Sequence, residues 1–314
     1  MKQLGHLLQE DTAGDPMGRR RLWTGKRLSQ IAQELRRLGI AVSPNTVRRL
    51  LDRLGYGLHA NRKSVSVTHR QRDQQFHCIV RRKKCFQRRA LPIISVDSKK
   101  RELIGNFKNP GRVWSLESPA VNDHDFRSQA KGIAVLYGIF DLLANRGSVF
   151  VGTSHDTPEF AASNIAQWWR QDGRKNYPQA SRLLILADTG GSNGARVRAW
   201  KYNLQRQLVD PFQLKATVCH YPTGASKWNP IEHRLFSEIS KHWAGQPLES
   251  YPTLLRLIAE TTTKTGLRVK STLVSKHFET GKKVSAENMR KLSVVKNAIL
   301  PQWNYTLHPR KNTN

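Results

Sequence analysis

The middle of the chain alternates short apolar segments with longer amphipathic ones, and this order limits the folds that it can adopt. Segments rich in β-branched and aliphatic residues, as is typical of strands, cover about 91–97, 133–142, 148–152, 182–187 and 216–221. Segments with apolar residues at helical spacing cover about 158–171, 195–209 and 230–243. The turn residues Asn145 to Gly147 predict a hairpin between the second and third strands.

Three antiparallel strands followed by parallel strands with crossover helices is the order of an RNase H-like fold. We therefore predict an α/β protein in which residues 91–246 form a five-stranded mixed sheet with flanking helices. An all-α helix-turn-helix domain is expected over residues 1–66, a basic linking helix over 67–90 and a basic extension over 247–314. A chain of 314 residues is long enough for about two such domains.

Acidic side chains stand where three of the expected elements begin or end. Asp97 ends the segment LPIISVD, Asp188 ends RLLILAD, and Glu232 lies in the first turn of the helix opened by Asn229-Pro230. In the expected fold these positions meet at one edge of the sheet, where open α/β sheets bind ligands. Mg²⁺ prefers a few carboxylate oxygens and keeps water and substrate phosphate in its other positions. The sequence therefore predicts a metal-binding trio of carboxylates.

Each acid also has a purely structural explanation. Asp97 is placed to start a turn, and Asp188 is placed to cap the glycine-rich turn TGGSNG. Asn229 and Glu232 have the spacing of a capping box, in which the glutamate bonds back to the amide of the capping residue. Glu232 also shares one stripe of its helix with Phe236, which turns its carboxylate toward the buried face. An acid there is costly unless it is paired or metal-bound, so the three positions together favour a site.

The charge of the chain indicates the class of its partner. Lysine and arginine number 53 against 23 aspartates and glutamates, which gives a net charge of +30. The excess is +15 over residues 1–90, +6 over 91–263 and +9 over 264–314. Nucleic acid is the commonest partner of so basic a surface. We therefore expect double-stranded DNA to be held by the two basic flanks around a less charged catalytic middle.

The cysteines and the apolar segments bear on where the protein acts. Cys78, Cys85 and Cys219 are odd in number and lack C-x-x-C spacing, so we expect reduced thiols and neither a disulfide framework nor a zinc finger. The longest apolar stretch, 132–144, is too short to span a membrane and contains Asp141. These features predict a soluble cytoplasmic protein with no membrane partner.

Residues 26–56 have the pattern of a helix-turn-helix. The first expected helix has apolar residues at helical spacing, and Ser43-Pro44 marks the start of the second, as an N-cap followed by proline. The apolar face of the second helix leaves five polar side chains for a DNA groove, namely Asn45, Thr46, Arg48, Arg49 and Arg53. A small basic hairpin that only packs on the rest of the chain is the alternative.

Further basic side chains are candidates for contacts with phosphate. The segment 68–89 is expected to form a linking helix, and its polar face carries Arg81, Arg82, Lys83 and Lys84. Lys99, Lys100 and Lys227 stand beside the acids in the sequence. Charges of this kind are also common on solvated surfaces, so the pattern leaves both explanations open.

Four segments resemble those of a known family. They are ISVDSKKRELIGNFKNPGR, LLILADTGGSNGARVRAWK, VCHYPTGASKWNPIEHRLFSEIS and TTTKTGLRVK. Together they resemble bacterial insertion-sequence transposases of the ISAzo group, a DDE family distantly similar to mariner-type elements, over nearly the whole chain. Two features depart from the family pattern. Thr189 follows Asp188 where the family carries glycine, and the chain begins soon before the helix-turn-helix, which bears on recognition of the element's ends.

The resemblance implies a transposase in which Asp97, Asp188 and Glu232 bind two Mg²⁺ ions, with Mn²⁺ as a substitute. Two metals about 3.5–4 Å apart activate the attacking oxygen and neutralise the leaving one in phosphodiester chemistry. Water would first free a 3′-OH at the element's end, and this hydroxyl would then attack target DNA. The implied partners are the terminal repeats, target DNA and further copies of the chain, in a homodimer or a higher homo-oligomer.

Two other functions fit parts of the sequence. A transposase relic would occupy DNA through its helix-turn-helix without cutting it. An aspartic peptidase would use Asp188-Thr189-Gly190, since two such aspartates can form a dyad in a homodimer. The peptidase would leave Asp97, Glu232 and the basic flanks without a role. Chelation by EDTA separates the transposase from the peptidase, because it should abolish transposase chemistry and leave an aspartic peptidase active.

Overall fold

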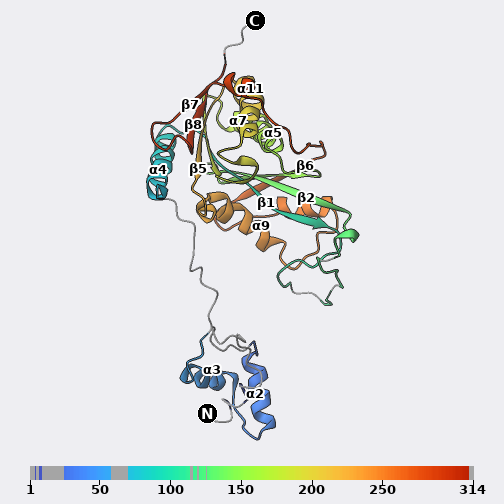
Figure 1. Ribbon diagram of the computed structural model, residues 1–314. Helices are drawn as coiled ribbons and strands as arrows, with labels where there is room; N and C mark the ends of the chain where they lie inside the picture. The colour runs from blue at the N-terminus through green and yellow to red at the C-terminus, as the bar shows by residue number, and fades with distance from the viewer. Residues whose placement is uncertain are drawn as a thin grey trace. The chain divides into compact units, whose positions relative to one another are not determined.

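The computed structural model describes residues 4, 7–8, 25–57, 70–113, 116–118, 120–124 and 126–310. It divides into two compact units, one within residues 1–65 and one within 66–314, whose elements are labelled in Figure 1. The boundary expected at 66–67 and the first residues of the expected linking helix lie outside the described residues.

The described residues of the first unit include the short helices α2 (Leu28–Arg37) and α3 (Pro44–Arg53). Ser43 caps the second helix as the sequence predicts, because its hydroxyl accepts a hydrogen bond of 3.2 Å from the amide of Thr46. Gly39 ends the first helix with a φ of +80°, a conformation that glycine adopts without strain. The buried core consists of Leu4, Leu8, Ile31, Ala32, Leu35 and Val47.

The second unit is built on one mixed sheet of eight strands. In chain order these are β1 (Ile93–Ile104), β2 (Gly132–Asp141), β3 (Arg146–Gly152), β4 (Arg182–Asp188), β5 (Lys215–Tyr221), β6 (Arg268–Val274), β7 (Val294–Lys296) and β8 (Asn304–Leu307). Their spatial order is β6-β3-β2-β1-β4-β5-β8-β7. The first three strands are antiparallel, and β4 and β5 continue the sheet parallel to β1. This arrangement confirms the predicted α/β, RNase H-like fold class.

Three of the strands lie in the segment 247–314, which the sequence predicted to be an extension of a five-stranded domain. β6 pairs in parallel with β3, β8 pairs antiparallel with β5, and β7 pairs with β8 at the margin. The expected count of five strands is therefore too small. The physical reason is their position, since β6 lies at an edge of the sheet and its sequence RVKSTLV has mostly exposed or half-buried side chains. Such a strand lacks the apolar run that marks a central one.

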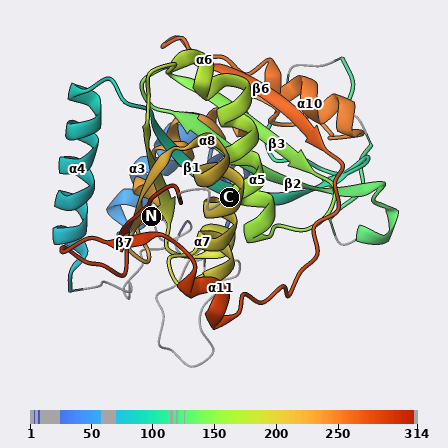
Figure 2. The same cartoon turned by 90° about the horizontal axis from the view of Figure 1, so that it is seen from above.

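Helices cover both faces of the sheet, and each of the three that the sequence predicted contains a π-helical turn. On one face lie α5 (Pro158–Trp168) and α7 (Arg198–Leu204), which continue as the turns η2 (Trp169–Gly173) and η4 (Gln205–Val209). On the other lie η6 (Glu232–Phe236), α9 (Ser237–His242), α10 (Tyr251–Ala259) and α4 (Arg72–Arg88). Figure 1 shows α5 and α7 above the sheet and α9 below it, and Figure 2 shows α4 and α10 at opposite sides of the unit.

Alternating residues of the central strands divide the core into layers. Ile94 and Val96 of β1 pack with the helices α5 and α7, whereas Ile93 packs with Ile79 and Phe86 of α4. Because side chains alternate along a strand, Asp97 shares the face of Ile93. No described helix is long and apolar enough to cross a membrane, and the three cysteines are free.

Candidate active site

Asp97 and Asp188 stand on neighbouring parallel strands, at the point where the pairing of β1 with β4 ends. The strand that was expected to end at Asp97 continues to Ile104, because β2 pairs with it beyond the edge of β4. β1 and β4 pair from Ile93 opposite Leu184 to Val96 opposite Ala187, so the next residue on each strand is one of the two acids. Both side chains are half-buried. The alternation of the strands places both carboxylates on the face that α4 and α9 cover. The structure therefore brings these two sequence-predicted residues together.

The helix that carries Glu232 is fastened to β1 by two buried polar side chains. The hydroxyl of Ser95 accepts a hydrogen bond of 3.0 Å from the amide of Ile231. The same hydroxyl donates to the side-chain oxygen of Asn229. Ser95 and Asn229 are both 0% exposed, so their polar atoms are satisfied by each other and by nearby backbone. This fixes the first turn of the helix beside the part of β1 that carries Ser95 and Asp97.

The side-chain nitrogen Nδ2 of Asn229 connects the start of the helix to β1 and β4. It donates to the carbonyl of Val96 at 3.3 Å and to Oδ1 of Asp188 at 3.1 Å. The capping box suggested by the sequence is absent here, because the side-chain oxygen of Asn229 faces Ser95, and the Glu232 amide bonds to the main-chain carbonyl of Asn229 at 3.1 Å. Asn229 thus orients a candidate catalytic carboxylate directly.

Sequence reasoning missed the role of Ser95. The available signal was a serine in an otherwise aliphatic buried strand, two residues before Asp97 and hence on the same face. A second signal was Gly138, which lies opposite Asp97 in β2. A Cβ at this glycine would lie 2.6 Å from the ring of Phe236, so only glycine allows the Glu232 helix to approach this closely.

Burial and neighbouring carboxylates change the pKa values of the two aspartates. Burial, together with the neighbouring charges of Asp188 and Glu232, raises the pKa of Asp97 to about 8, although its carboxylate accepts a 2.8 Å hydrogen bond from the Ser98 amide. Burial also raises the pKa of Asp188 to about 6, with a further contribution from Glu232 and an opposing one from the Asn229 hydrogen bond. The acids are therefore close enough to repel one another.

The donor set of this site fits a hard divalent cation. Among the described residues, no three His, Cys, Asp or Glu side chains have the spacing of a preformed metal centre. The converging groups are carboxylates alone, which suits Mg²⁺ or Mn²⁺ better than zinc. A cation between them would offset the burial and the repulsion that together raise the pKa of Asp97. The π-helical turn that begins at Glu232 is a further feature common at functional sites.

Two tyrosines hold the loop that follows Asp188. The hydroxyl of Thr189 donates to the carbonyl of Tyr221 on β5. Farther along the loop, Asn193 accepts a 3.0 Å hydrogen bond from the hydroxyl of the buried Tyr137. Thr189, which stands where the resembling family carries glycine, therefore ties the loop to the neighbouring strand.

Three buried aromatic side chains form a hydrogen-bonded series that ends at the main chain of Asp188. Nδ1 of His220 lies 2.8 Å from the carbonyl of Asp188, and its Nε2 lies 3.1 Å from the hydroxyl of Tyr305. Trp200 donates to the same hydroxyl at 2.9 Å. Burial lowers the pKa of His220 to about 4, so the ring is neutral near pH 7. Because Tyr305 belongs to β8, the last strand contributes to the support of the site.

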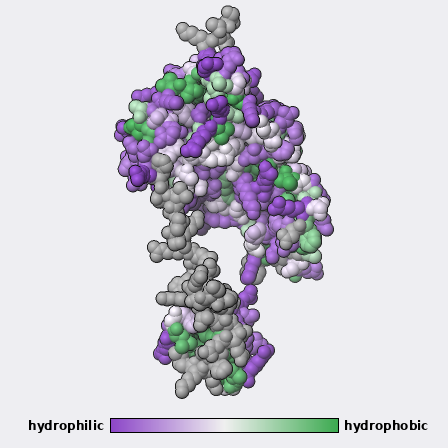
Figure 3. All heavy atoms as spheres, in the orientation of Figure 1, coloured by the Kyte–Doolittle hydropathy of each residue, from purple (hydrophilic) through white to green (hydrophobic). Residues whose placement is uncertain are grey.

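The predicted DNA-contacting residues lie on α3, on α4 and near the acids. On α3 the exposed ones are Asn45, Arg48, Arg49 and Arg53, while Thr46 is half-buried. On α4, Arg81 and Lys84 are exposed, and Arg82 and Lys83 are half-buried. In the view of Figure 3, hydrophilic residues cover much of the visible described surface.

The three lysines near the acids differ in their surroundings. Lys100 and Lys227 are exposed. Lys99 is engaged instead, because its Nζ lies 2.5 Å from Oε1 of Glu102 and 4.8 Å from the ring centroid of Trp243. A contact between Lys99 and phosphate would have to break this ion pair.

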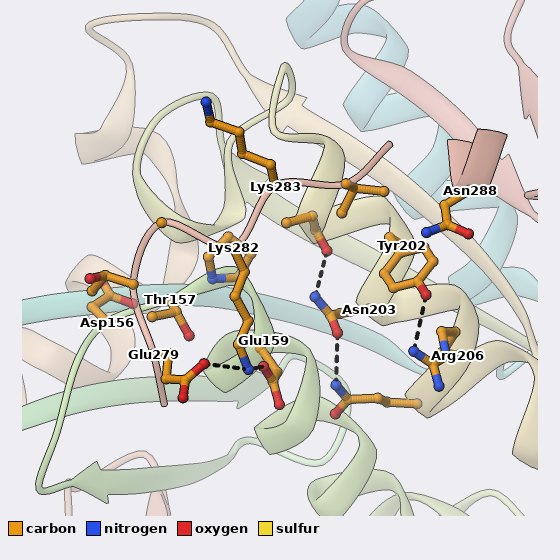
Figure 4. A pocket seen from close by; sticks show the side chains of 16 residues that line it. Asp156, Thr157, Glu159, Tyr202, Asn203, Arg206, Glu279, Lys282, Lys283 and Asn288 are labelled. Carbon is orange, nitrogen blue, oxygen red and sulfur yellow. Dashed lines mark hydrogen bonds and ion pairs between the residues drawn. The ribbon is translucent and has the colours of Figure 1, made fainter. Parts of the chain in front are cut away.

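One cavity of the second unit is separate from the carboxylates. It has a volume of about 650 Å³ and lies between the start of α5, α7 and residues 279–288 (Figure 4). Lys282 crosses its floor with Nζ 3.3 Å from Glu159 and 3.3 Å from Glu279. None of the three candidate catalytic acids lines it. The candidate site is therefore an open sheet edge rather than this pocket.

An RNase H-like sheet with two aspartates and a glutamate at its carboxyl edge defines the class of DDE proteins. A family model described as the Rhodopirellula transposase DDE domain matches residues 3–309. The chain therefore belongs to this family of DDE transposases, which confirms the resemblance seen in the sequence.

Solved structures of a mariner transposase are similar in part. The Mos1 transposase paired-end complex with left transposon end is 16% identical, with a TM-score of 0.45, over 82% of this chain and 69% of that chain. The Mos1 strand transfer complex is 18% identical, with a TM-score of 0.44, over 82% and 69%. A search of curated proteins finds no match.

Proposed function

We propose that the chain cuts and joins DNA as an insertion-sequence transposase, with Asp97, Asp188 and Glu232 as its catalytic residues. The observation that carries this proposal is the meeting of these carboxylates at one sheet edge in a member of a DDE transposase family. The buried supports of two of them argue for a site under geometric constraint, because Ser95, Asn229 and His220 all lie at 0% exposure.

The three carboxylates would hold two Mg²⁺ ions, or Mn²⁺ in their place. Such ions activate an attacking oxygen at neutral pH and neutralise charge on the leaving oxygen. The chain itself supplies orientation: Asn229 directs one carboxylate of the site, and the Ser95 hydroxyl sets the start of the Glu232 helix. No covalent bond between protein and DNA is needed. Hydrolysis at the element's end would free a 3′-OH, which would then displace a 3′-oxygen in target DNA.

Double-stranded DNA would be held outside this site by the basic flanks. The exposed α3 side chains of Asn45, Arg48, Arg49 and Arg53, with Thr46 beside them, would enter a groove. Arg81, Arg82, Lys83 and Lys84 would meet phosphates, as would the exposed Lys100 and Lys227. Lys99 would join them after leaving Glu102. A homodimer or a higher homo-oligomer would bring two element ends to one target.

A labelled duplex that carries the element's own end tests this function. The full chain should cut one defined strand position with Mg²⁺ or Mn²⁺, and EDTA should abolish the cut. A relic would bind the duplex in all conditions and cut it in none, which would refute the enzymatic proposal. Proteolysis of a peptide substrate that persists in EDTA would instead support the peptidase.

A further inference from the structure

Trp228 is an exposed aromatic residue directly before the helix of Glu232. It ends the short turn η5 (Ser226–Trp228) and is 54% exposed. The other tryptophans that the structure describes are 5% exposed or less, namely Trp168, Trp169, Trp200, Trp243 and Trp303. A solvent-exposed indole that contributes little to the core requires another explanation than packing.

Two series of contacts connect Trp228 with the Asp188 strand. The next residue in the chain, Asn229, donates to Oδ1 of Asp188 at 3.1 Å. The ring itself meets that of Phe76 edge-on, with centroids 5.9 Å apart. Phe76 also contacts Tyr221 at 6.2 Å, and Tyr221 pairs with Asp188 in the sheet register. The exposed indole is thus part of the same rim as the candidate active site.

Cations flank this aromatic surface. Nζ of Lys227 lies 5.6 Å from the Trp228 ring centroid, and the guanidinium of Arg72 lies 5.7 Å from that of Phe76. A flat apolar ring beside mobile positive charge is the combination by which proteins bind single-stranded nucleic acid, since every base has a π-face and every nucleotide has a phosphate. An acidic partner protein would match the same cations and ring, but membership of a DDE transposase family favours nucleic acid.

We propose that Trp228 stacks on an unpaired nucleobase of the DNA strand beside the scissile phosphate, with Lys227 against a neighbouring phosphate. This inference rests on the proposed function and specifies how the strand is presented. Taking a base out of the duplex loses its pairing and stacking, and the indole replaces part of that stacking. The strand that is unpaired in this way is free to bring its phosphate to the carboxylates. Trp228 would act by positioning the substrate.

A binding experiment with a fluorescent base tests the proposal. The probe is a short duplex with one unpaired 2-aminopurine, compared with the same duplex fully paired, and EDTA is present to prevent cutting. The wild-type chain should bind the unpaired probe more tightly and quench its fluorescence. Trp228→Ala should lose this preference by roughly 5- to 150-fold, the range for loss of one base–aromatic stack. Trp228→Phe should keep much of it, because a flat ring remains.

A matched control is Phe126→Ala, which removes an aromatic side chain that is 56% exposed. It should leave the preference for the unpaired probe unchanged. The proposal is overturned if Trp228→Ala keeps the preference, or if it weakens binding to paired and unpaired duplexes alike. A wild-type chain that binds neither duplex would refute the proposed function itself, and the inference with it. Thermal unfolding of each variant confirms that these changes do not arise from loss of the fold.

Discussion

The two units of the chain present their candidate functional residues in opposite ways. In the first unit, the polar side chains of α3 are mostly exposed on a helix that is set by one serine cap and a small core. In the second unit, the acids are half-buried and are positioned by residues far away in sequence, as with Ser95 and Ile231, 136 positions apart. An exposed surface should tolerate exchange of single side chains, whereas the carboxylate site depends on a supporting structure.

The largest expected effect is at the acids themselves. Asp97→Asn, Asp188→Asn or Glu232→Gln keeps the shape of the side chain and removes the charge that would hold a metal. DNA cleavage should fall by more than about 100-fold, which is the upper range for loss of a group that only supports a metal ligand. DNA binding and the fold should persist, as measured by a gel-shift assay and circular dichroism. A variant that cuts at a near-normal rate would remove that acid from the site.

The next effect should come from the supporting network. Asn229→Ala leaves Ser95 without its side-chain partner and Asp188 without a hydrogen bond. We expect a roughly 10–100-fold higher Mg²⁺ requirement or lower cleavage rate, and a loss of about 1–3 kcal/mol in the free energy of unfolding. A Mg²⁺ titration of cleavage and urea unfolding measure the two. Asn106→Ala, at an exposed amide, is the control. An unchanged Mg²⁺ requirement would contradict the role given to Asn229.

A smaller effect is expected in the first unit, where the change should be in selectivity. Asn45→Ala or Arg48→Ala should each reduce the free-energy preference for the element's own end by about 1–3 kcal/mol, the value of one good pairing with a base. Replacing Arg82 and Lys83 by alanine should weaken binding to all duplexes alike, because phosphates carry no sequence information. Competition between end-sequence and scrambled DNA at fixed salt separates the two. Equal shifts for both sets would make α3 a packing or non-specific element.

The smallest effect is a dependence of stability on pH in the absence of metal. The pKa of Asp97 is raised from 3.8 to about 8, so its contribution is fully present below pH 3.8 and is lost as the pH rises through about 8. Stability should fall between pH 6.5 and 8, by at most about 1.4 kcal/mol per pH unit. The pKa of His220 is lowered from 6.5 to about 4, so this residue destabilises the fold only as the pH falls below 6.5. Urea unfolding measures the free energy of unfolding at each pH. It should depend less on pH in Asp97→Asn, and less in the wild-type chain when Mg²⁺ is added.

The sequence predicted best what depends on local pattern. The apolar segments that precede Asp97 and Asp188 were found in the sequence because central strands are buried on both sides, whereas the polar continuation of β1 to Ile104 was not. The cap at Ser43 was found because its signal lies within four residues. The spacing of Asn229 and Glu232 suggested a local cap, but Ser95 competes for the Asn229 side chain from another strand, which no local pattern reveals.

The strands β6, β7 and β8 were not predicted, for a related reason. β6 is stabilised by pairing with β3, and β8 by pairing with β5, so their own sequences need not be strongly apolar. The support that Tyr305 gives to His220 was likewise beyond sequence reasoning, because it requires knowing that β8 lies beside β5. The exposure of Trp228 could not be predicted either, because a single tryptophan in a sequence does not show whether its ring is packed or exposed.

The pairing of β8 with β5, through which Tyr305 reaches His220 behind Asp188, has a consequence for the newly made chain. At about 5–20 residues per second, the ribosome takes roughly 10–40 s to proceed from Asp97 to Tyr305. Pairings between such distant segments also form slowly, because the loops between them must first close. During this time the acids exist in the nascent chain without their full support. If the chain has the proposed function, we therefore expect an unfinished chain to be a poor nuclease.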